Sequence, residues 1–199
     1  MARSKLRAAR EFFSLVSQTD PNRYGKAYGL TALFPILPGR TDALEAHLNA
    51  LEPEESPLAR LPQLHMSRLH VIRGLVYQGP PQIPETLDHH YLIFTVSIDG
   101  EIDAFLRDFA SRLGPDADAI FSHTVGFPGT GDPAAFARWA IQHKRNNGYL
   151  VSPWPFETVP RIHEALRVQA GFGELISRSG ELSDAELQAE FCTLMAGGQ

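Results

Sequence analysis

The sequence has little cysteine, no long apolar run and no dense cluster of charge. Its 199 residues include one cysteine, Cys192, so no internal disulfide can form and nothing indicates an oxidising compartment. No apolar run approaches the roughly 20 residues that a bilayer requires, and no apolar signal-peptide segment follows the N-terminal charges. These absences favour a cytoplasmic protein without a membrane span.

Several enzyme and metal-binding motifs are also missing. The chain has no HExxH, CxxC, Asp-rich calcium loop or GxSxG sequence. The glycines at 126, 129 and 131 form a turn that lacks the lysine of a P-loop and the spacing of a dinucleotide fingerprint. The adjacent His89 and His90 would point in opposite directions on a strand, which disfavours a shared metal. We therefore predict no metal site.

The charge of the chain is modest and scattered. The formal net charge is −5, and basic residues concentrate only within the first ten positions. Nucleic-acid binding requires dense positive charge to displace counterions from phosphates, so we predict no nucleic-acid partner. A solvated helix face is the simpler explanation of the basic N-terminus.

An ordered alternation of strand and helix patterns is present. Strands are indicated by β-branched and aromatic residues, and helices by apolar residues at 3.6-residue spacing. In chain order the patterns predict a strand over 28–37, a helix from Thr41, strands over 66–77 and 90–98, a helix over 101–113 and a strand over 119–125. We expect Thr41 to be a helix N-cap, Gly74 a β-bulge, and Gly114-Pro115 a helix end.

This order predicts an α+β, ferredoxin-like βαββαβ unit with a four-stranded antiparallel sheet and both helices on one face. We assign the unit to residues 23–130, an N-terminal helix to 1–22 and a helical C-terminal extension to 131–199. The other face of the sheet is then left for water, a ligand or another chain.

The extension carries its own local signals. Asp132 is an expected N-cap, Ser183 and Glu186 form a capping box, and the aromatic residues over 149–156 are interrupted by prolines.

The segment over 56–70 is the most unusual in composition, because it holds Arg60, His65, Arg68 and His70. On a strand, Arg68 and His70 would project to one face. An imidazole transfers protons near neutral pH, and a guanidinium stabilises negative charge. We predict Arg60, His65 and Arg68 as catalytic residues. The alternative is that they are surface residues paired with carboxylates.

His70 and His123 are the candidates for binding a cofactor, and the cofactor considered is haem, since histidine is a common axial ligand. His143 and His163 in the helical extension are further candidates for an axial ligand. The alternative is that these are core or surface histidines with an ordinary structural role.

The stretches PILPG, SPLARLPQLHMSRLHVI, YLIFTVSIDG and IFSHTVGFPG resemble a group of bacterial ferredoxin-like proteins over residues 28–129. That group is similar at fold level to the dimeric α+β barrel superfamily, which includes haem enzymes, monooxygenases and isomerases. The matching positions are Arg60, His65, Arg68 and His123. Some haem-binding members have two such units per chain and this sequence has one, which weakens the haem interpretation.

Two functions follow as hypotheses. The first is an enzyme or small-molecule-binding protein that uses the open sheet face as its pocket. The second is a non-catalytic assembly or accessory subunit that acts through oligomerisation. Both are compatible with a homo-oligomer.

Overall fold

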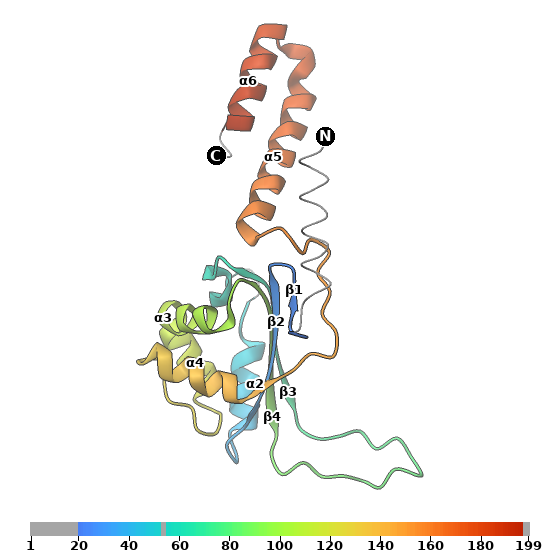
Figure 1. Cartoon of the computed structure of the whole chain (residues 1–199), viewed down its shortest axis with the longest axis vertical. Helices are drawn as coiled ribbons and strands as arrows, with labels where there is room; N and C mark the ends of the chain where they lie inside the picture. The colour runs from blue at the N-terminus through green and yellow to red at the C-terminus, as the bar shows by residue number, and fades with distance from the viewer. Residues whose placement is uncertain (1–19, 53–54, 197–199) are drawn as a thin grey trace. The chain divides into compact units, whose positions relative to one another are not determined.

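The computed structural model describes residues 20–52 and 55–196, which form a mixed α+β structure (Figure 1). The chain divides into two compact units, Met1–Phe156 and Glu157–Gln199. The helical extension, expected from residue 131, begins at Glu157 in this division. The helix expected within residues 1–22 falls on positions 1–19, outside the described residues.

The helices and strands of the first unit are, in order, β1 (Arg23–Tyr24), β2 (Ala27–Pro35), α2 (Thr41–Asn49), the 3₁₀ turn η2 (Pro57–Arg60), β3 (Leu64–Ile72), β4 (Tyr91–Asp99), α3 (Ile102–Phe121), α4 (Pro133–Gln142) and β5 (Lys144–Arg145). Those of the second unit are α5 (Val159–Arg178), the 3₁₀ turn η3 (Ser179–Glu181) and α6 (Asp184–Ala196).

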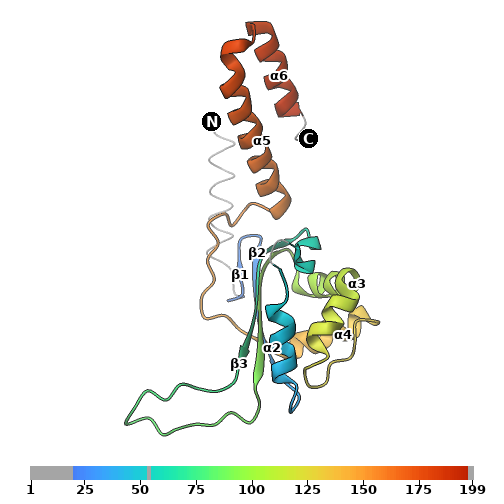
Figure 2. The same ribbon diagram turned by 180° about the vertical axis from the view of Figure 1, so that it is seen from behind.

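The sheet is antiparallel throughout and has five strands among the described residues, in the order β1–β2–β4–β3, with β5 also paired to β2. The expected number of four strands is therefore wrong. Helices α2, α3 and α4 lie on one side of the sheet, to its left in Figure 1 and to its right in Figure 2.

The strand expected over 119–125 is also wrong, because α3 continues to Phe121. Gly114, with φ 15° and ψ −94°, bends the helix instead of ending it. Pro115 is tolerated there because a proline in the first turn after a break removes no helical hydrogen bond. Beyond the helix, Thr124 reaches the sheet through a single bridge to Ile36.

Aromatic rings fill the space between the sheet and the helices. Phe109 of α3 and Phe136 of α4 stack with centroids 5.6 Å apart, and Phe34 of β2 stacks on Trp139 of α4 at 4.4 Å. Burial of such large apolar side chains is the main favourable contribution to folding. The rings therefore fix which face of the sheet is covered.

Two of the expected helix caps are present and one is not. The Asp132 carboxylate accepts hydrogen bonds from two first-turn backbone N–H groups at 2.9 and 3.1 Å. Ser183 and Glu186 form the expected capping box, with the Ser183 N–H donating to Glu186 Oε2 at 2.9 Å and the Glu186 N–H donating to Ser183 Oγ at 3.4 Å. Thr41 is not an N-cap, because Arg40 holds that position and supplies no side-chain cap.

A long connection over 73–90, here called the arm, joins β3 to β4 and projects from the sheet on the side away from the helices (Figures 1 and 2). The arm exposes large apolar side chains, with Val76 81% and Ile83 79% exposed. Gly74, the expected bulge, lies in this arm, and the bulge that the structure contains falls between Leu64 and Met66.

Candidate functional site

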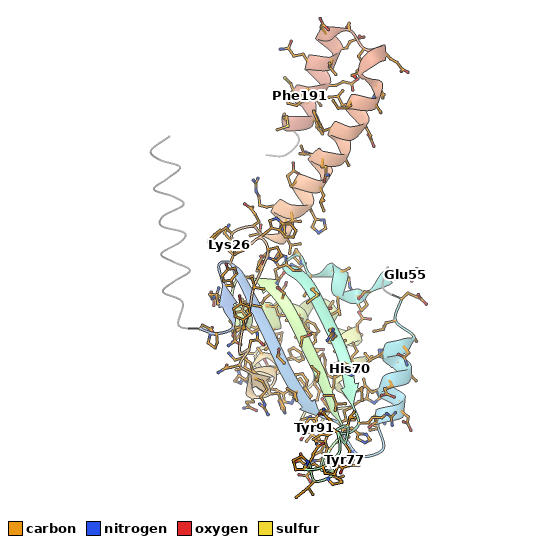
Figure 3. All side chains as sticks on the ribbon, turned by 90° about the vertical axis from the view of Figure 1, so that its right-hand side faces the viewer. Lys26, Glu55, His70, Tyr77, Tyr91 and Phe191 are labelled. Carbon is orange, nitrogen blue, oxygen red and sulfur yellow. The ribbon has the colours of Figure 1, made fainter. Side chains whose placement is uncertain are left out.

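The face of the sheet away from α2–α4 is here called the open face, and Figure 3 looks onto it. Burial alternates along β4. The buried side chains that meet the helices are Leu92, Phe94, Val96 and Ile98. Successive side chains alternate across a strand, so Tyr91, Ile93, Thr95, Ser97 and Asp99 belong to the open face.

A β-bulge sets the direction of His65. Leu64 lies opposite Ile98, but Met66 lies opposite Ser97, so His65 is the extra residue of β3. Leu64 therefore turns toward the core and Met66 toward the open face. His65 Nε2 lies 2.8 Å from Asp99 Oδ1, and the two side chains are 20% and 11% exposed.

The His65–Asp99 pair has the geometry of an acid–base dyad. A carboxylate on Nε2 fixes the tautomer and leaves Nδ1 as the free base. No hydrogen bond holds His65 Nδ1 among the described residues. The backbone N–H of Asp99 donates to the Gln63 carbonyl at 2.8 Å, which anchors the carboxylate-bearing end of β4.

Arg68 and His70 follow on the same face, opposite Thr95 and Ile93 of β4. Both are exposed, and Figure 3 shows His70 on β3 at the side of the sheet. Three strand residues span about 10 Å, so the long Arg68 side chain lies within reach of a small molecule bound at His65. None of the ion pairs among residues 20–52 and 55–196 involves Arg68.

Part of the open face is already covered, on its β2 side. Asn147 Nδ2 donates to the Gly29 carbonyl at 3.0 Å, and Thr31 Oγ1 donates to Asn147 Oδ1 at 2.9 Å. A side chain at Gly29 would come within 3.0 Å of Leu150. The segment after β5 thus covers β2, while Met66, 63% exposed, marks the uncovered β3 side.

Arg60 does not join this group. It forms an ion pair with Asp116 of α3, and its Nε donates to the Pro57 carbonyl at 3.2 Å. These two residues line a surface cavity of about 590 Å³ together with Ala50, Leu51, Glu52, Glu55, Ser56 and Pro57. Since α3 covers the opposite face of the sheet, Arg60 lies away from His65.

His123 also lies apart, after α3, where its carbonyl accepts a hydrogen bond from the Leu37 N–H at 2.9 Å. It is 9% exposed, and its buried Nδ1 has no hydrogen-bond partner. Burial lowers the pKa of His123, and the nearby charges of Arg40 and His47 lower it further. His70 and His123 therefore do not converge, and the pair does not fit a common haem site.

A second polar cluster lies where β2 ends and β4 begins. The Thr41 hydroxyl and His90 Nδ1 are 2.8 Å apart, beside a cavity of about 290 Å³. Arg73 also lines this cavity, and hydrogen bonds to Glu45 and Asp42 raise its pKa. The sequence did not predict this cluster, because its members come from α2 and from the two ends of the arm, which lie far apart in the chain.

Comparisons with protein-family models, with curated proteins and with solved structures each found no match. Within the described residues, no helix has the length and apolar character needed to cross a membrane. The same residues contain no group of three or more His, Cys, Asp or Glu side chains that could hold a metal ion.

Proposed function

We propose that the open face binds a small oxygen-rich or anionic molecule, on which His65 and Asp99 exchange a proton. The observation that carries this proposal is the 2.8 Å contact between His65 Nε2 and Asp99 Oδ1. With Nε2–H donated to the carboxylate, Nδ1 is free to accept a proton, and Asp99 stabilises the resulting imidazolium. Arg68 would stabilise negative charge on the bound molecule.

The proposed fold relationship is to the ferredoxin-like group and the dimeric α+β barrel superfamily. It is supported by β5, the short strand after α4, which pairs antiparallel with β2 beside the path β2–β4–β3. Fold similarity alone assigns no reaction, so the proposed chemistry rests on the side chains.

The test is a titration of ¹⁵N-labelled full chain with inorganic phosphate and with benzoate, followed by two-dimensional NMR. We expect shifts to concentrate at residues 65–70 and 95–99, and Arg68→Gln to weaken binding about tenfold or more. Arg138→Gln is the matched control, since Arg138 is exposed on α4, on the covered side. Shifts confined to the Thr41–His90 cavity, or equal weakening by both variants, would refute the proposal.

A second candidate function is assembly through oligomerisation. It is favoured by the exposed side chains of the segment 149–156, where Tyr149 is 84% and Trp154 62% exposed, and by those of the arm. Monomeric proteins seldom expose several large apolar side chains so close together in the chain. Light scattering of the full chain is expected to give a mass above 22.0 kDa. A strictly monomeric mass would remove this candidate.

A further inference from the structure

The second unit is a helical hairpin with almost no interior. Among its described residues, α5 contributes two buried side chains, Val159 and Leu175, and α6 contributes none. A pair of helices cannot enclose a core, and an isolated helix as short as α6 is marginal in water. The hairpin therefore needs a further surface to bury its apolar side chains.

An apolar stripe runs along one side of this hairpin. Phe172 of α5 and Phe191 of α6 are in ring contact at 6.3 Å and are 43% and 42% exposed. Ile176 and Met195 each follow one of these rings by four residues, so they extend the same side, and they are 57% and 50% exposed. These four residues are here called the hairpin stripe.

The stripe is uncharged, although the hairpin around it is acidic. The stripe itself contains no ionisable residue, and all three arginines of the hairpin are paired within it. These ion pairs are Arg161 with Glu157, Arg167 with Glu164 and Arg178 with Glu190. Residues 157–199 hold seven Asp and Glu side chains against these three arginines, so the hairpin as a whole is acidic and contact between two copies rests on the uncharged stripe.

We infer that the hairpin stripe is a homodimer interface, in which the α5–α6 hairpins of two copies of this chain form a four-helix bundle. Helices of 20 and 13 residues are about 30 Å and 20 Å long, and at a helix width near 10 Å two facing hairpins bury roughly 1,000 Å². That area is the lower limit for a specific interface. The inference deepens the second candidate function by naming the surface and the partner.

The test is sedimentation equilibrium of the full chain, wild type and variants. We expect a wild-type dimer, and a double variant Phe172→Asp with Ile176→Asp to raise the dissociation constant roughly a hundredfold, because each buried charge opposes association. Ala170→Asp is the matched control, since Ala170 is exposed on α5 away from the stripe. We expect it to leave the dissociation constant within about threefold.

The exposed Cys192, the only cysteine in the chain, gives a second measurement that requires no destabilising variant. A nitroxide attached to Cys192 of the wild-type chain is expected to show dipolar coupling to a second label. A wild-type monomer without coupling would overturn this inference and the assembly function together. A dimer that survives the double variant would overturn the hairpin interface alone and leave assembly to another surface.

Discussion

His123 is buried with an unpaired Nδ1, and this makes stability depend on pH. Burial, and then Arg40 and His47, lower its pKa below the ordinary 6.5. The unfolded chain therefore binds a proton more readily, so stability is retained above about pH 6.5 and decreases as the pH falls below it. In the His123→Leu variant, we expect the free energy of urea unfolding to fall less between about pH 7 and pH 5 than it does in the wild type. An unchanged slope would show that other groups are responsible.

Gly25 and Gly39 both have positive φ, +65° and +75°, but their surroundings differ. A Cβ at Gly25 would overlap the carbonyl oxygen of Pro155, which also accepts the Lys26 N–H at 2.6 Å, whereas a Cβ at Gly39 would meet no other residue within 4 Å. We expect Gly25→Ala to cost about 3 kcal/mol of unfolding free energy and Gly39→Ala about 1 kcal/mol. Urea unfolding of both variants measures the difference, and equal losses would contradict it.

The His65–Asp99 pair shows how far a local pattern predicts a site. The dense run of Arg and His over 56–70 singled out His65, but its partner lies 34 positions away. A bulge in β3 then decides where the imidazole points, and neither the partner nor the bulge has a signal in the local sequence. Arg60 belonged to the same run, yet it turns to Asp116 because η2 ends beside α3.

At the scale of the element, an N-cap whose side chain accepts backbone hydrogen bonds should stabilise its helix more than an N-cap without such bonds. The Asp132 carboxylate holds two backbone N–H groups of α4, whereas Arg40 caps α2 with no side-chain bond. We expect Asp132→Ala to lower the free energy of unfolding by about 1 kcal/mol, and Arg40→Ala by less than about 0.5 kcal/mol at pH 8. Chemical unfolding followed by circular dichroism compares them. A larger loss for Arg40→Ala would contradict the assigned caps.

Element prediction succeeded where pattern and packing agree. β4 alternates strictly, and the structure buries its even-numbered side chains against the helices. Prediction failed over 119–125, because the apolar residues there suit a strand as well as the end of a helix. Ile120 and Phe121 follow Ala117 by three and four residues, and all three are buried on α3. Their packing against the aromatic core outweighed a local strand preference.

At the scale of the whole molecule, the arm and the segment 149–156 are the irregular, exposed parts of the described residues where we expect proteolysis to begin. The arm has no regular structure around Tyr77, which is 49% exposed, whereas Phe34 and Phe94 are buried in the sheet. We expect brief chymotrypsin treatment to cut after Tyr77, and within 149–156, before any cut at a buried phenylalanine. Mass spectrometry of the first fragments measures the order. Early cleavage after Phe34 or Phe94 would mean that the core opens as readily as the arm.

The extra residue in β3 also determines how the chain tolerates a change in length. Leu64 and Met66 would share one face in a regular strand, but the bulge turns them to opposite faces. Deleting His65 would remove the bulge and leave Leu64 opposite Ile98 and Met66 opposite Ser97, so both side chains would keep their faces. Replacing His65 by another residue keeps the bulge but removes the same imidazole. The sheet should therefore tolerate either change better than the His65–Asp99 pair does.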